Sequence, residues 1–145
     1  MKKVFSEEEH IRNSEYSVVY RQNIVWNDDN LLVVSDFDWT NDEIVSYGEA
    51  NLGFKTYDFK NNKRLTSSDI FNKRFESDDF DKAVLNYFKW KGDKLNCNIS
   101  EGFTSKGFYI IGRGNHGWYV KPIFVPYQAV EPFLKEDFKK EYWKR

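Results

Sequence analysis

Two strand-to-helix passages constrain the fold of this chain more than any other feature of its sequence. The first, Tyr57–Phe71, predicts a strand, a polar turn at 61–63 and then a short helical turn. Three consecutive polar side chains could cap that helical turn: Ser67, Ser68 and Asp69. The second passage, Ile123–Leu134, predicts a strand followed by a helix. Pro126 ends this strand because proline has no N–H to donate to a neighbouring strand.

A longer helix is predicted between these passages, at Phe80–Lys91. Ser77, Asp78 and Asp79 precede it as capping residues, and Gly92 is expected to end it. Its apolar residues recur at helical spacing and form one stripe: Phe80, Ala83, Val84, Tyr87 and Phe88. We expect this stripe to face the core.

The remaining apolar segments favour strands. They are Ser14–Tyr20, Ile24–Trp26, Leu31–Ser35, Gly53–Phe59, Leu95–Ile99, Gly107–Ile111 and Trp118–Val125, with a less clear strand near Asp38–Ile44. The chain closes with a helix in two pieces around Pro132, Gln128–Glu131 and Phe133–Trp143. We therefore predict one α+β domain over residues 1–145, an antiparallel sheet with one long helix and a C-terminal helix packed on it.

Composition excludes some classes of chemistry. Cys97 is the single cysteine, so no internal disulfide can form, and the two histidines, His10 and His116, are too few for a Cys/His zinc cluster. We expect no metal and no cofactor. Aromatic residues make up 19% of the chain. Most belong in the core, but Trp and Tyr also anchor interfaces.

Charge is unevenly distributed although the net charge is only −1. The segment from Gln22 to Phe54 has no Lys or Arg and seven acids: Asp28, Asp29, Asp36, Asp38, Asp42, Glu43 and Glu49. Such a segment disfavours nucleic acid, which binds through Lys and Arg, and suits a basic protein. We expect its contact residues to include Asp36, Asp38, Trp39, Asp42 and Glu43.

The acidic segment also contains Asp36-x-Asp38-x-Thr40, which is similar to the first motif of Asp-based phosphatases. There the first Asp is the nucleophile, the second the general acid/base, and both would hold Mg²⁺. A helix should follow directly, but the sequence after Thr40 is β-like, and Trp39 stands where glycine is usual. Two surface acids on a strand are the favoured interpretation, with the phosphatase kept as an alternative.

Gly112–Gly117 fits G-x-G-x-x-G. A dinucleotide site needs a helix to begin there, whereas Trp118–Val125 predicts a strand. A hairpin loop is favoured, and because loops carry binding residues, Arg113, His116 and Trp118 are further contact candidates.

Four short motifs, in the same order over Leu31–Phe138, resemble the RsiV-type C-terminal domain of lysozyme-sensing anti-sigma factors: Tyr47–Asn51, Tyr57–Phe71, Lys106–Tyr109 and Ile123–Leu134. The same domain occurs beside some peptidoglycan deacetylases. The resemblance implies recognition of a secreted, basic, wall-degrading enzyme. This chain departs from the family at Asn51, where relatives have His, and in a shortened segment at Gly112–Trp118.

The first residues, Met1–Phe5, begin like a signal peptide, but the acidic stretch Ser6–His10 replaces the apolar region. No run approaches the ~18 apolar residues of a membrane span. We expect a cytoplasmic, non-enzymatic binding protein with no nucleic-acid or membrane partner. The leading hypothesis is an immunity protein that neutralises a basic toxin enzyme. An RsiV-like, lysozyme-binding sensor is the first alternative, and the phosphatase the second.

Overall fold

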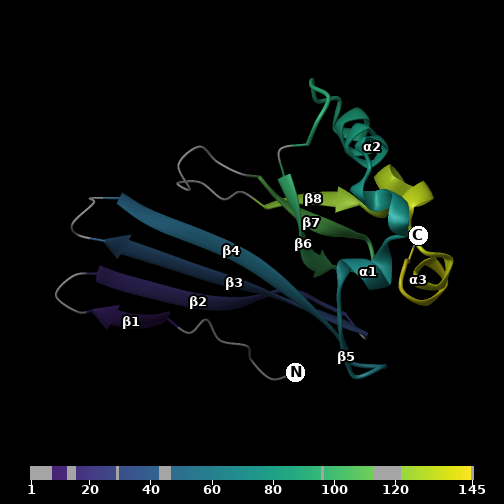
Figure 1. Ribbon diagram of the computed structural model, residues 1–145. Coiled ribbons are helices and arrows are strands. Elements are labelled where there is room, and N and C mark those ends of the chain that lie inside the picture. The colour runs from purple at the N-terminus through teal and green to yellow at the C-terminus, as the bar shows by residue number, and fades with distance from the viewer. Residues whose placement is uncertain are drawn as a thin grey trace.

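The computed structural model describes residues 8–12, 16–28, 30–42, 47–95, 97–112 and 122–144; for 8–12, 16–19, 38–42 and 47–51 it describes the backbone alone. Its elements confirm the α+β prediction. The described strands form two antiparallel sheets, of five and of three strands, where we expected one. Figure 1 shows the long strands of the larger sheet extending to one side, with the smaller sheet and the helices gathered at the other end.

The larger sheet has its strands in chain order. They are β1 (Glu8–Arg12), β2 (Tyr16–Asn27), β3 (Leu31–Asp42), β4 (Tyr47–Asp58) and β5 (Lys63–Leu65). β2 is continuous, so the two strands predicted at Ser14–Tyr20 and Ile24–Trp26 are one strand with an irregularity between Ile24 and Trp26. β3 likewise joins the two segments predicted separately at Leu31–Ser35 and Asp38–Ile44.

Side chains alternate between the two faces of the larger sheet, as strand geometry requires. On β4, Phe54, Thr56 and Asp58 are buried, whereas Tyr57 and, directly after the strand, Phe59 are exposed. The sequence pattern at Gly53–Phe59 left this choice of inward face open.

The smaller sheet consists of β6 (Cys97–Phe103), β7 (Gly107–Gly112) and β8 (Pro122–Pro126). β8 ends at Pro126, as predicted. β6 has an irregularity between Ile99 and Phe103, where Glu101 takes a positive φ of 53°. Gly107 is required where β7 meets β8, because a Cβ there would lie 2.3 Å from the carbonyl oxygen of Val125.

The two sheets are joined by the hydroxyl of Thr56, a fully buried side chain on β4. Thr56 Oγ1 donates to the carbonyl oxygen of Glu101 and accepts from the N–H of Phe103, both at 2.8 Å. Beside it, the rings of Phe54 and Tyr109 stack with their centroids 4.9 Å apart. One side chain thus satisfies two backbone groups at the irregular part of β6.

The helical elements are α1 (Ser67–Ile70), η1 (Lys73–Glu76), α2 (Asp78–Phe88), η3 (Tyr127–Phe133) and α3 (Glu136–Glu141). α1 begins after Thr66, so the cap position is one residue before the three that we expected. Asp69 contributes from within the helix, because its carboxylate accepts the Thr66 N–H at 2.8 Å. The C-terminal helical region is in two pieces, as predicted, but the break is not at Pro132, which lies inside η3; α3 begins only at Glu136 and ends before the expected Trp143.

Ser77, one of the three predicted capping residues, is the residue before α2, so the helix begins at Asp78 and not at the expected Phe80; it ends at Phe88, before the expected Lys91. Lys89 ends it in the left-handed conformation, so Gly92 is not the terminator. The buried stripe also differs from the prediction, since Leu85 is buried and Tyr87 is 50% exposed.

The core lies between the smaller sheet and the helices, and aromatic rings dominate it. Phe71, which directly follows α1, has its ring centroid within about 6 Å of four others: Phe75, Phe80, Phe103 and Phe108. Most of the aromatic surplus is thereby accounted for. Among the described helices, none is long and apolar enough to cross a membrane.

Candidate functional site

Of the predicted contact residues, Asp36 is the one whose side chain the structure describes. It lies on the central strand β3 and is neutralised locally. Its carboxylate accepts from the Tyr20 hydroxyl at 2.9 Å and from Gln22 Nε2 at 2.5 Å, and Lys55 Nζ lies 3.3 Å away. Burial works against the charged form, but these three partners outweigh it and hold the Asp36 pKa below its ordinary value.

This geometry corrects the expectation that the acidic segment has no counter-base. Lys55 lies just outside that segment in sequence, but it pairs with Val34 in the register of β3 and β4, two residues from Asp36. Asp28 is also engaged locally, because it accepts the N–H groups of Asn30 and Leu31 in the β2–β3 turn. These two acids have structural roles.

The other predicted contact residues are less defined. Asp38, Trp39 and Asp42 lie on β3, paired in register with Asn51, Ala50 and Tyr47, but their side chains are outside the described part. Glu43, Arg113, His116 and Trp118 lie outside the described residues altogether. Their contact roles stay predictions.

The arrangement that a phosphatase motif requires is not formed. Asp36 and Asp38 lie in the interior of β3, which continues to Asp42 between two antiparallel neighbours. Thr40 is itself part of the strand, and so are the two residues that follow it, Asn41 and Asp42. The motif is a run of strand residues.

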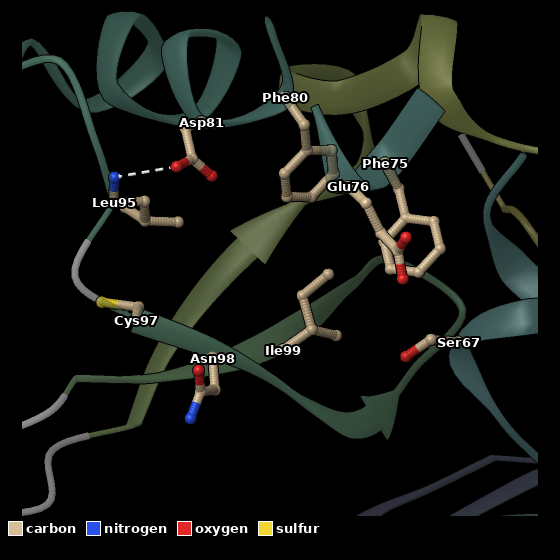
Figure 2. A pocket seen from close by; sticks show the side chains of 9 residues that line it. All are labelled: Ser67, Phe75, Glu76, Phe80, Asp81, Leu95, Cys97, Asn98 and Ile99. Carbon is tan, nitrogen blue, oxygen red and sulfur yellow. Dashed lines mark hydrogen bonds between the residues drawn. The ribbon is translucent and has the colours of Figure 1, made fainter. Parts of the chain in front are cut away.

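A pocket of about 590 Å³ lies between α2 and the smaller sheet (Figure 2). That volume is within the range of about 300–1,000 Å³ typical of ligand sites. Helical residues form one side and β6 residues the other, with the lining Ser67, Phe75, Glu76, Phe80, Asp81, Leu95, Cys97, Asn98 and Ile99. We call this the α2–β6 pocket.

The two charged residues of the α2–β6 pocket are both acids, Glu76 and Asp81. Asp81 Oδ2 accepts the Leu95 N–H at 3.1 Å, which fixes its carboxylate at the pocket wall (Figure 2). Neither acid forms an ion pair with a described residue. With Phe75, Phe80 and Ile99 supplying apolar walls, the lining combines negative charge with hydrophobic surface.

The acidic environment of the pocket also affects the pKa of the Cys97 thiol. Burial, and secondly the negative charge of Asp81, raise the pKa of its thiol above the ordinary value. Because the thiolate is the reactive form, Cys97 is poorly suited to act as a nucleophile or metal ligand. The same negative potential that disfavours a thiolate favours a cation in the pocket.

The other described regions contain no comparable candidate binding site. No three His, Cys, Asp or Glu side chains come together as a metal site anywhere in the described ranges. A smaller pocket of about 320 Å³ at the β4–β5 hairpin has a basic rim, but its charges are already engaged. Arg64 pairs with Glu101 at 2.7 Å, and Lys63 with Asp69 at 3.4 Å.

Sequence reasoning did not find the α2–β6 pocket. The sequence pattern assigned Phe80 to the stripe facing the core and did not single out Glu76 or Asp81. One available signal was the position of Asp81, directly after Phe80 and therefore beside the apolar stripe of α2. The opposing wall could not be inferred, because nothing in the sequence says that β6 packs there.

No protein-family model matches the chain, and no curated protein matches it. Solved structures of similar fold include a DUF3298-family protein from Bacteroides fragilis, with a TM-score of 0.64 and 16% identity over 88% of this chain and 57% of that one. Another is a DUF3298-family protein from Pseudomonas aeruginosa PAO1, with a TM-score of 0.63 and 14% identity over 90% of this chain and 66% of that one. The chain thus spans about three-fifths of the length of these proteins, and at such identities the likeness establishes a shared fold, which is compatible with an RsiV-type domain.

Proposed function

We propose that this domain is a non-enzymatic binding module for a basic protein, and that the α2–β6 pocket receives a Lys or Arg side chain of that partner. The observation that carries the proposal is that both charged residues lining this pocket, Glu76 and Asp81, are acids, and that neither forms an ion pair with a described residue. Asp81 is half-buried whereas Glu76 is exposed. A half-buried carboxylate such as Asp81 gains more than an exposed one from a cation that brings its own hydrogen-bond donors.

The apolar walls narrow the partner's chemistry. Lys and Arg have long hydrocarbon stems below their charged groups, so such a side chain can lie along Phe75, Phe80 and Ile99 while its head meets the acids. A bare metal ion would gain nothing from these walls. A flexible basic side chain fits both features of the lining.

Two biological settings are compatible with a basic partner. An immunity-type inhibitor of a basic toxin enzyme is the first candidate, and the acidic pocket supports it as it would support any basic partner. A sensor for a basic wall-degrading enzyme such as lysozyme is the second candidate, favoured by the fold shared with DUF3298 proteins and by the RsiV-type motifs. Both settings use the same recognition chemistry.

The test measures binding of two basic probes, lysozyme and a basic ribonuclease, to the wild-type domain and to a Glu76→Gln/Asp81→Asn variant. Asn can still accept the Leu95 N–H, so the variant should remain folded. Loss of charge-assisted contacts worth about 1.5–3 kcal/mol predicts roughly ten- to a hundred-fold weaker binding.

The matched control is Asp78→Asn/Asp79→Asn, which removes the same charge from exposed positions of α2 that do not line the pocket. Equal weakening in the two double variants would show that net charge, and not the pocket, drives binding. Preference for lysozyme over the ribonuclease would favour the sensor, and the reverse would favour the inhibitor. Failure of the wild-type domain to bind either probe would count against a general affinity for basic enzymes.

A further inference from the structure

The second surface of interest is the end of α2, formed by Tyr87–Lys94, which we call the α2 tip. In Figure 1 the segment that follows α2 projects at the upper edge of the molecule, away from the larger sheet. Tyr87 is 50% exposed and Trp90 is 39% exposed, although both are large aromatic residues. The sequence stripe predicted Tyr87 to be buried, so this exposure needs an explanation.

The aromatic rings of the tip are held in fixed positions. The backbone N–H of Trp90 donates to the carbonyl oxygen of Leu85 at 2.9 Å, across the turn in which Lys89 adopts the left-handed conformation. The Trp90 ring then stacks on Phe88 with centroids 4.5 Å apart and planes 16° apart. Tyr87 meets Phe88 edge-on at 5.1 Å. Phe88 is partly buried against the core and holds the exposed rings of Tyr87 and Trp90 at the surface.

Basic side chains surround these rings. Lys89, Lys91 and Lys94 are all exposed, and Asp93 is the one acid among them. None of the three lysines forms an ion pair within the described part of the chain. Because the whole chain has a net charge of −1, an attraction to anionic surfaces would have to come from a local patch such as this one.

The size of the patch argues against a protein as its main partner. Tyr87 and Trp90 together expose roughly 200 Å², taking about 150–250 Å² for each aromatic side chain. A stable protein interface needs about 800 Å² on each side. A lipid bilayer requires no such area, since Trp and Tyr rings lie favourably at the membrane–water boundary and lysines are attracted to anionic headgroups.

We propose that the α2 tip is a membrane-surface contact. Tyr87 and Trp90 enter the headgroup region of an anionic phospholipid bilayer, and the lysines of the tip are attracted to its negatively charged headgroups. This contact needs no spanning segment, and it revises the sequence-based expectation of no membrane partner. Combining rings with basic residues supplies the two signals that peripheral attachment requires. The contact is separate from the α2–β6 pocket, and its test does not depend on that site.

Co-sedimentation with vesicles tests this. The probes are vesicles of phosphatidylcholine alone and vesicles in which phosphatidylglycerol replaces about a third of it. The wild-type domain should bind the anionic vesicles, less so as salt rises. Lys91→Gln/Lys94→Gln should weaken binding about thirty-fold, from the loss of two headgroup attractions. Trp90→Ala should weaken it roughly ten-fold or more.

Two controls match these changes elsewhere on the surface. Lys73→Gln/Lys140→Gln removes the same charge from exposed positions away from the tip, and Phe59→Ala removes an aromatic ring that is 57% exposed. Both should bind as the wild type does. Should Trp90→Ala lower the melting temperature, Tyr87→Ala, which alters a half-exposed ring, replaces it.

Three results would overturn the proposal. They are absence of wild-type binding to anionic vesicles, equal losses in the tip and control variants, and concentration-dependent self-association that Trp90→Ala abolishes. The last would assign the tip to contact with a second copy of the chain.

Discussion

Replacing Thr56 by valine should destabilise the protein strongly although valine has nearly the same shape. Thr56 is fully buried, and its hydroxyl serves both the Glu101 carbonyl oxygen and the Phe103 N–H. Valine keeps the volume but leaves those two backbone groups without the hydroxyl. At about 1–3 kcal/mol for each buried group left unsatisfied, and with some relaxation of the irregular strand β6, we expect a loss of about 2–4 kcal/mol.

The matched variant is Thr56→Ser, which keeps the hydroxyl and loses one methyl group, at a cost of about 1 kcal/mol. Thermal or urea denaturation should therefore rank the proteins wild type, Thr56→Ser, Thr56→Val. For a domain of this size the valine variant should melt about 6–12 °C below the wild type. If Thr56→Val proved as stable as Thr56→Ser, the hydroxyl would not be what joins the two sheets.

Three further predictions use other parts of the structure. Lys89→Gly should stabilise the domain by about 0.5–1 kcal/mol relative to Lys89→Ala, because glycine adopts the left-handed conformation without strain; a glycine variant that melts no higher than the alanine variant would contradict this. Asp58 is buried, but hydrogen bonds from Tyr142 and Asn61 outweigh the effect of burial and lower its pKa. Its contribution to stability is therefore fully present above the unfolded-state pKa of about 3.9, and it is lost as the pH falls through the folded-state pKa. Unfolding at equilibrium should therefore show a shallower loss of stability below about pH 4 for Asp58→Asn than for the wild type, and equal slopes would remove Asp58 from this account. Finally, incubation with Mg²⁺ and a panel of phosphomonoesters should give no turnover, whereas turnover abolished by Asp36→Asn would revive the phosphatase alternative.

Local sequence signals predicted those elements whose causes are local. The strand stop at Pro126 follows from a missing N–H group and is found. Capping residues located the α2 start to within two residues, and the C-terminal helical region is in two pieces, although they meet after Phe133 and not at Pro132. The end of α2 was misplaced because Gly92 is the residue expected in a left-handed turn, and here Lys89 adopts that conformation.

Features that depend on distant packing were not accessible from the sequence. Two sheets instead of one, the partner of Asp36 on β4 and the opposing walls of the α2–β6 pocket all arise from strand register and from the placement of β6. The predicted stripe of α2 included Tyr87, which is exposed, and omitted Leu85, which is buried. Residue spacing shows which side chains share one face of a helix, but it does not show which of them the neighbouring elements bury.

The central claim, that the α2–β6 pocket receives a cationic side chain, is tested most directly with a pair of blocked peptides that differ in charge alone. One carries arginine and the other citrulline, which has a similar shape and no charge. In NMR titrations of the ¹⁵N-labelled domain, the arginine peptide should shift the amide signals of Asp81, Leu95 and Ile99 saturably, with a Kd on the order of 1 mM, whereas citrulline should not. Asp81→Asn should abolish the arginine response. Equal shifts with both peptides, or shifts confined to residues around Asp36, would contradict the account.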